Sequence, residues 1–143
     1  MKVSSLAVAG ALTLWAPGAE AQTFKKEVIC AARAERLYRK DQANFAISAD
    51  INITGYEDHY NPKMGRCFML EHTLITGSGS AELVTTLIDA FEGRVLATYS
   101  SNNGVADCEL TPDYMTTHCK SGPEFDAFVE QYVGKVGGGV RHY

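Results

Sequence analysis

The sequence lacks the short motifs by which many enzymes and metal proteins are recognised. Its 143 residues contain no C-x-x-C pair, no H-x-x-x-H or H-x-H spacing and no phosphate-binding glycine loop. A G-x-S-x-G nucleophile elbow is also absent. These absences argue against a zinc site, a redox-active cysteine pair, nucleotide binding and serine-hydrolase chemistry. We therefore expect no cofactor and no metal ion, and we favour a protein that is not an enzyme.

The sequence also has no apolar run long enough to cross a bilayer. The longest such run, from Leu6 to Trp15, follows Lys2 and precedes the small residues of Ala19–Ala21. A positive start, a short apolar run and a small-residue site are typical of a secretory signal peptide. We predict a signal peptide over residues 1–21 with cleavage before Gln22. Residues 22–143 would then form a single small, soluble domain in the periplasm or outside the cell, without a transmembrane segment.

Four cysteines lie in the predicted mature chain, namely Cys30, Cys67, Cys108 and Cys119. In an oxidising compartment an even number of cysteines indicates disulfide bonds. Spacing alone leaves three connectivities open. We favour Cys30–Cys67, which would join a first helix to a first strand, with Cys108–Cys119, which would close a short loop before the last helix.

The net charge of −4 is unevenly distributed along the chain. Residues 23–40 hold six bases and two acids, whereas residues 41–143 hold six bases and fourteen acids. The simpler, purely structural interpretation is a solvated basic helix that packs beside an acidic domain. The alternative is attachment to an anionic surface through that helix. The bases concerned are Lys25, Lys26, Arg33, Arg36 and Lys40. Export argues against nucleic acid as a partner.

Three segments have the composition of antiparallel strands, at residues 66–76, 83–91 and 94–100. Gly-Ser residues at 77–80 and the Glu92-Gly93 pair supply the two hairpin turns. In the first strand, Phe68, Leu70, His72 and Leu74 share the more apolar face, and Cys67, Met69, Glu71, Thr73 and Ile75 share the other. Residues 102–119 read as a loop that can hold a further short strand.

Two segments have helical periodicity. Residues 23–45, with Thr23 as a candidate N-cap, place one apolar stripe opposite the bases. That stripe comprises Phe24, Val28, Cys30, Ala31, Ala34, Leu37, Tyr38 and Phe45. Ser121 and Glu124 form a capping-box pattern before a second helix, and residues 134–143 read as a flexible tail. We predict an α+β fold: an antiparallel meander of three or four strands, flanked by an N-terminal and a C-terminal helix and stapled by disulfides.

Residues 48–63 are the least regular part of the sequence, with a turn signal at Asn61-Pro62. Ile47, Ile53 and Tyr56 fit either a short strand or the anchors of a loop. That turn does not account for His59 and Tyr60, which we consider possible ligand contacts. A His–carboxylate pair around His59 or His72 is the basis of an alternative hypothesis, a small periplasmic hydrolase.

The segments "HYNPKMGRCF", "DAFEGRVLATY" and "EFDAFVEQYV", together with the last two cysteines, resemble an uncharacterised family of small exported bacterial proteins. That family carries a "YN-x-K…CF" segment, an "EG" hairpin and a C-terminal "EFD" helix. The resemblance implies a periplasmic or secreted setting and supplies no catalytic residue. Our leading hypothesis is a non-enzymatic binding or interaction module of the bacterial envelope, of the accessory-protein or inhibitor type. Its partner would be a protein or an envelope component.

Overall fold

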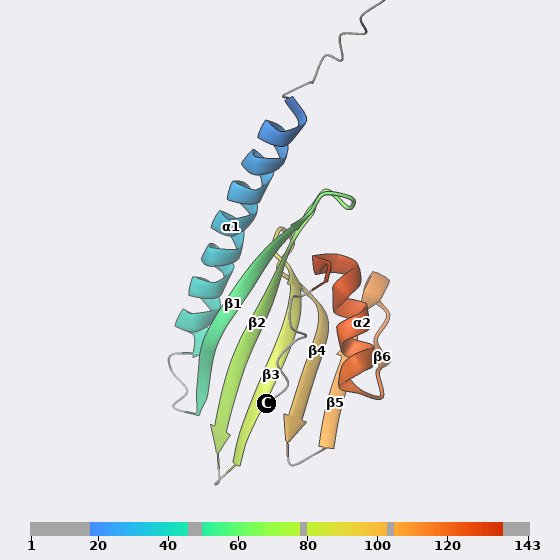
Figure 1. The fold of residues 1–143 in the computed structure, drawn as a ribbon. Helices are drawn as coiled ribbons and strands as arrows, with labels where there is room; N and C mark the ends of the chain where they lie inside the picture. The colour runs from blue at the N-terminus through green and yellow to red at the C-terminus, as the bar shows by residue number, and fades with distance from the viewer. Residues whose placement is uncertain (1–17, 46–49, 78–79, 103–104, 136–143) are drawn as a thin grey trace, which may run out of the picture.

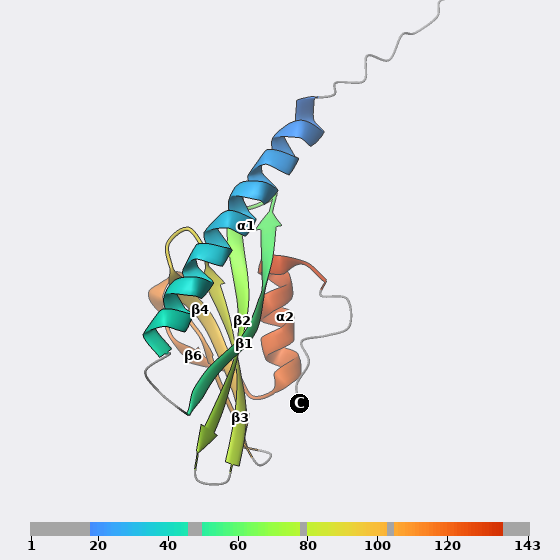
Figure 2. The ribbon, with the colours of Figure 1, turned by 90° about the vertical axis from the view of Figure 1, so that its left-hand side faces the viewer.

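The computed structural model describes residues 18–45, 50–77, 80–102 and 105–135, with the side chains of 18–20 excepted. Its elements form three layers, with one helix on each face of a single sheet (Figures 1 and 2). In chain order they are α1 Gly18–Phe45, β1 Ile51–Asn61, β2 Arg66–Gly77, β3 Ser80–Asp89, β4 Arg94–Asn102, β5 Val105–Leu110, η1 Pro112–Tyr114, β6 Thr117–His118 and α2 Gly122–Val133.

The sheet is a six-stranded antiparallel meander in the order β1-β2-β3-β4-β5-β6. The α+β class, the flanking helices and the disulfide staples are confirmed, but the meander has more strands than the three or four expected. The additions are β1, β5 and β6, in segments read as irregular or as a loop. In β1 the pairing register shifts between Ile53 and Gly55, and such a bulge disturbs the alternation by which a strand is recognised.

The two faces of the sheet carry separate cores. Phe68, Leu70 and Leu87 lie on the face that α2 covers, together with Phe125 and Val129 of the helix. The opposite face packs on α1, and its buried residues are Cys30, Ala34, Cys67, Met69, Ile88 and Ala90. Adjacent residues of β2 therefore serve different cores, which agrees with the two faces assigned to this strand from its sequence.

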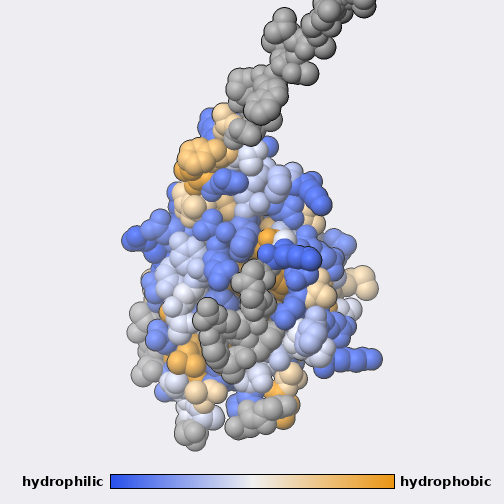
Figure 3. Space-filling model, in the orientation of Figure 1, coloured by the Kyte–Doolittle hydropathy of each residue, from blue (hydrophilic) through white to orange (hydrophobic). Residues whose placement is uncertain are grey.

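Helix α1 differs from the prediction at its N-terminal end. It begins at Gly18, so Thr23 lies inside the helix rather than at its cap. Its first turns extend beyond the sheet, and apolar surface is visible at that end (Figures 2 and 3). Phe24 and Val28, predicted to face the core, are 68% and 52% exposed. The expected stripe is buried only where strands lie beneath it, at Cys30 and Ala34.

The disulfides join Cys30 to Cys67 and Cys108 to Cys119, which is the pairing favoured from the sequence. The first links α1 to the start of β2, and its Cα atoms are 5.2 Å apart. The second links β5 to the residue after β6, beneath the start of α2. Each helix is thus tied covalently close to the sheet face that it covers.

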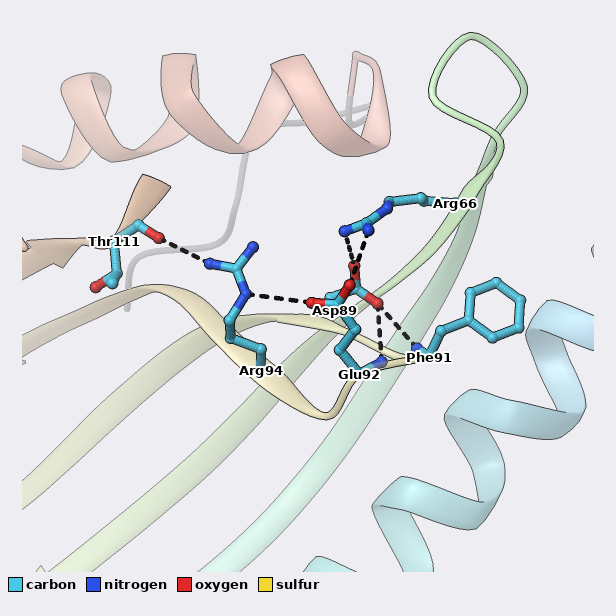
Figure 4. Close-up of polar contacts among 6 residues, drawn as sticks. All are labelled: Arg66, Asp89, Phe91, Glu92, Arg94 and Thr111. Carbon is cyan, nitrogen blue, oxygen red and sulfur yellow. Dashed lines mark hydrogen bonds and ion pairs between the residues drawn. The ribbon is translucent and has the colours of Figure 1, made fainter. Parts of the chain in front are cut away.

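The β3–β4 turn is held by a network around Asp89, whose side chain is fully buried (Figure 4). Asp89 Oδ1 accepts from the backbone N–H groups of Phe91 and Glu92, and Oδ2 accepts from Arg66 at 2.8 Å. Glu92 is ion-paired with Arg66 on one side and Arg94 on the other. Gly93 closes the turn at φ 66°, a conformation that glycine adopts without a steric penalty. The network fixes the turn over which α1 passes.

The turn expected at Asn61-Pro62 connects β1 to β2 and also contacts α2. Asn61 Oδ1 accepts from the N–H groups of Lys63 and Met64, while its Nδ2 donates to the carbonyl of Tyr132. Ser121 caps α2 as predicted, because its Oγ accepts from the N–H of Glu124, but the Glu124 carboxylate accepts from the N–H of Lys120 instead of that of Ser121. Gly134 ends the helix, and residues 136–143 of the predicted flexible tail lie outside the described residues.

Candidate ligand-binding groove

Helix α1 leaves part of its sheet face uncovered. A helix is about 10 Å across and neighbouring strands are about 4.8 Å apart, so one helix covers about two strands. The contacts of α1 with the strands are mainly with β1 and β2, at one side of the six-stranded sheet. The same face of β3 and β4 therefore borders open space beside the helix.

That space is a groove of about 510 Å³ between the C-terminal half of α1 and the sheet. Its volume lies within the range of roughly 300–1,000 Å³ typical of small-molecule sites. Apolar side chains make up about half of the lining: Leu37, Phe45, Ile51, Ile75, Val84, Ile88 and Val95. The polar residues of the lining are Lys40, Asp41, Glu71, Thr73, Thr86, Glu92 and Thr98.

Glu71 is the residue of the groove with the most unusual surroundings. It lies mid-strand in β2, opposite Tyr56 of β1 and Thr86 of β3, and only 6% of it is exposed. Its Oε1 accepts a hydrogen bond from Thr73 Oγ1 at 3.4 Å, and Oε2 is buried without a partner among the described residues. Burial, and then the charge of Asp41, raises the pKa of Glu71 to about 7, against the hydrogen bond from Thr73.

Such a carboxyl destabilises the ligand-free protein because a buried polar atom without a hydrogen bond is unfavourable. A bound molecule that carries a donor would relieve this. The terminal side-chain torsion of a glutamate adopts a broad range of angles. Rotation about it can therefore turn either carboxyl oxygen toward the groove. Perturbed carboxyls in a cavity mark candidate functional sites on physical grounds.

Two further acidic residues line the groove with Glu71. Asp41 of α1 is partly buried, which raises its pKa, while the neighbouring Lys40 lowers it. Glu92, at the end of the groove near the β3–β4 turn, is already ion-paired with Arg66 and Arg94. The carboxyls left to meet a ligand are therefore those of Asp41 and Glu71.

The structure separates His59 and Tyr60, the two ligand contacts considered from the sequence, onto opposite faces of β1. Tyr60 is opposite Cys67 on the α1 side, and Lys26 Nζ lies 5.8 Å from the centre of its ring. With Asn61, Tyr60 lines a cleft of about 220 Å³ at the end of α2. His59 is opposite Phe68, and its Nε2 lies 3.6 Å from Glu57 Oε2. The two residues do not share one site.

His72, named in the hydrolase hypothesis, lies on the α2 face of β2. Its Nδ1 lies 3.3 Å from the hydroxyl of Thr85, which is 1% exposed. Burial lowers the pKa of His72, and the charge of Glu57 opposes that shift. None of the cavities described here is lined by His59, His72 or Thr85. These cavities therefore do not support a hydrolytic centre at the two histidines.

The basic residues of α1 fall into two groups. Lys25 and Lys26 lie on the exposed first turns, beside Phe24 and Val28. Arg33, Arg36 and Lys40 border a shallow hollow of about 210 Å³ against the β3–β4 turn. There the guanidinium of Arg33 lies 5.9 Å from the centre of the Phe91 ring. Among the described residues, no ion pair is formed by any of these five bases.

Within the described part of the chain, no group of histidine, cysteine and acidic residues is arranged to hold a metal ion. Neither α1 nor α2, as described, combines the length and the apolar composition needed to cross a membrane. No protein-family model, curated protein or solved structure matches the chain. The resemblance to exported bacterial proteins therefore stays a prediction, and the site must be judged from its geometry.

The sequence analysis missed Glu71 as a site residue. One signal was present, because Glu71 is an acid inside the apolar run "CFMLEHTLI". Alternation assigned it to the less apolar face of its strand, where an acid is ordinarily solvated. Only the position of α1 over β1 and β2 shows that this face is covered at Glu71 and open beyond it.

Proposed function

We propose that the protein is an exported, non-enzymatic binding module whose ligand site is the groove between α1 and the sheet. The observation that carries this proposal is the buried, incompletely hydrogen-bonded carboxyl of Glu71 in the lining of a 510 Å³ groove. The apolar wall supports a small amphiphilic ligand, since apolar area provides affinity and a few polar groups fix orientation.

Binding accounts for this arrangement better than catalysis does. The hydrolase hypothesis requires a carboxylate and a histidine in hydrogen-bond reach of one another. Among the described residues the hydrogen-bond partner of the Glu71 carboxyl is Thr73. Among the described residues no hydrogen bond joins Glu71 to a histidine, a cysteine or a second carboxyl, and this favours recognition over a hydrogen-bonded catalytic pair.

A groove-filling variant tests the proposal. Thr86 lies on the floor, so Thr86→Trp should occupy the space, whereas Thr116→Trp adds the same ring at an exposed position. Nile red, a neutral apolar dye, serves as the probe in a fluorescence titration. We expect the wild type and Thr116→Trp to bind the dye alike, and Thr86→Trp to bind at least about tenfold more weakly. Equal binding by all three proteins would exclude the groove as the site.

Export is part of the proposal. It is supported by the signal-like residues 1–21, by two disulfides and by the lack of a membrane-crossing helix in the described residues. Disulfides of this kind persist in oxidising compartments. Intact mass and N-terminal sequencing of protein recovered from the periplasm or the medium should give a chain that begins at Gln22. Recovery from the cytoplasm with Met1 or Lys2 as the first residue would contradict export.

A second candidate function is attachment to an anionic envelope surface. The exposed first turns of α1, with Lys25 and Lys26 beside Phe24 and Val28, favour it because basic and apolar residues together bind anionic lipid. Sedimentation with anionic vesicles across a salt series would test it. Binding should weaken as salt rises and should fall for the double variant Lys25→Glu/Lys26→Glu but not for Lys63→Glu in the β1–β2 turn. Binding that salt does not change would contradict an electrostatic attachment.

A further inference from the structure

The groove is chemically asymmetric. The α1 face of β3 and β4 supplies apolar and hydroxyl side chains, among them Val84, Ile88 and Val95, and neither strand contributes a titratable group to the lining. The acids lie toward α1 and β2, at Asp41 and Glu71. A ligand lying across the groove would therefore meet the carboxyls of Asp41 and Glu71 on the side of α1 and β2, and mainly apolar side chains on the side of β3 and β4.

From this asymmetry we propose that the groove binds an amphiphilic amine, whose ammonium head pairs with Glu71 while its hydrocarbon tail lies against Val84, Ile88 and Val95. This inference rests on the proposed function and adds the chemical class of the ligand. When Glu71 is ionised, the head must be a hydrogen-bond donor, because a carboxylate only accepts and one oxygen of Glu71 has no donor among the described residues.

Charge decides between the possible head groups. With Glu92 engaged by two arginines, the groove presents the carboxyls of Asp41 and Glu71 against the single ammonium of Lys40. A carboxylate head would meet two like charges, and like-charge juxtaposition is strongly unfavourable. A hydroxyl head would supply a donor but no charge. A charge-assisted hydrogen bond is about twice as strong as a neutral one, which favours the ammonium.

The proton balance of binding follows from the groups around Glu71. From α1 it is faced by Asp41 and Lys40, from β1 by Tyr56 and from β3 by Thr86, and Thr73 is its hydrogen-bond partner. With its pKa raised to about 7, Glu71 is largely protonated in the empty protein below neutral pH. An ammonium head favours the carboxylate form. Binding below pH 7 should therefore release a proton, and affinity should fall by up to about tenfold for each pH unit below 7.

Three probes that share an eight-carbon chain separate the head groups: octylamine, 1-octanol and octanoate. Calorimetric titrations would compare the wild-type protein, Glu71→Gln and Glu109→Gln. Glu109 is an exposed residue of β5, so the last variant removes the same charge away from the groove. We expect the wild type and Glu109→Gln to bind octylamine at least about tenfold more tightly than the other two probes at pH 8. Glu71→Gln should lose that preference.

The outcomes distinguish this inference from the proposed function. If octanol binds as tightly as octylamine, or if Glu71→Gln keeps the preference, the amine assignment is wrong and the groove remains a binding site. If octanoate is preferred, Lys40 receives the head and the assignment is likewise overturned. If none of the three probes binds, and Thr86→Trp binds Nile red as tightly as the wild type does, the proposed function fails too. Titration at pH 6 in two buffers of different ionisation enthalpy checks the proton release, and an octylamine complex that releases none contradicts a role for Glu71.

Discussion

Thr73 Oγ1 lies 3.4 Å from Glu71 Oε1 and gives this buried carboxyl its one hydrogen bond among the described residues. The two residues are alternate members of β2 on the face toward α1, so the strand itself sets their separation. A single long hydrogen bond does not replace the hydration that Glu71 loses on folding. The buried carboxyl of Glu71 therefore lowers the free energy of unfolding, and this effect can be measured.

Glu71→Gln should stabilise the protein in a pH-dependent way. The pKa of Glu71 is raised from 4.5 to about 7, so the folded protein holds its proton where the unfolded chain has lost it. Stability should therefore fall as the pH rises through this window. The shift corresponds to roughly 3 kcal/mol above pH 7. The variant should match the wild type near pH 4.5 and exceed it by about 2–3 kcal/mol at pH 8.

Urea unfolding followed by circular dichroism at several pH values measures this difference. Glu109→Gln is the matched control, because an exposed acid should give a small difference that does not grow between pH 5 and pH 8. A constant offset between Glu71→Gln and the wild type over the whole range would show that the pKa of Glu71 is not raised.

The two disulfides should differ in their effect on stability. Cys30–Cys67 spans 37 residues and Cys108–Cys119 spans 11. On the chain-entropy estimate, their removal as paired serine substitutions should destabilise the protein by about 4 and about 3 kcal/mol, respectively. Only the first pair ties α1 to the sheet, so its loss should also weaken Nile red binding, whereas loss of the second should not. Equal dye binding by both double variants would show that α1 is held without its disulfide.

Substitution of Asp89 should destabilise the protein more than substitution of other residues in the β3–β4 turn. Asp89→Ala removes the acceptor of two backbone N–H groups and the partner of Arg66, so we expect a loss of about 3 kcal/mol or more. Asp89→Asn keeps an oxygen for the N–H groups and should lose less. Glu92→Gln, at an exposed ion pair, should lose less than about 1 kcal/mol. Urea midpoints that place Glu92→Gln above Asp89→Ala in severity would contradict this ranking.

Residues along the apolar stripe of α1 should contribute unequally to the stability of the protein. Phe24→Ser should change the free energy of unfolding by less than about 0.5 kcal/mol, because Phe24 lies on the projecting turns. Ala34 is fully buried against the sheet, so Ala34→Leu should destabilise by about 1–3 kcal/mol through overpacking. Thermal unfolding of the two variants compares them directly. A large effect of Phe24→Ser would mean that another surface covers this end of the helix.

Local sequence patterns predicted the elements that depend on neighbouring residues. The Ser121–Glu124 cap, the Glu92-Gly93 turn and the three central strands follow from short-range chemistry, and each is present. The sequence left the segment of β1 open between a short strand and a loop, because its bulge near Gly55 interrupts the alternation of apolar residues. Helical periodicity likewise placed Phe24 and Val28 on the stripe expected to face the core. It carries no information about where the sheet beneath the helix ends, and both residues are exposed.

The candidate site could not be predicted from local patterns, because it depends on how α1 packs on the sheet. The groove exists because α1 lies over β1 and β2 of a sheet that continues through β3 and β4. Glu71, Asp41 and Val84 come from three elements, and no spacing along the chain connects them. His59 and Tyr60 stood out in the sequence because they are adjacent, and adjacency in a strand sends their side chains to opposite faces. A site formed between elements is visible only once their packing is known.

The most direct test of a groove that binds amphiphilic amines is an NMR titration of the ¹⁵N-labelled exported chain with octylamine at pH 8. The account predicts that the backbone N–H signals of Asp41, Glu71, Thr86 and Thr98 shift as octylamine is added. It also predicts that signals from α2 and β5 stay in place and that Glu71→Gln shows much smaller shifts. Shifts confined to α2 and β5, or shifts in Glu71→Gln that equal those of the wild type, would contradict it.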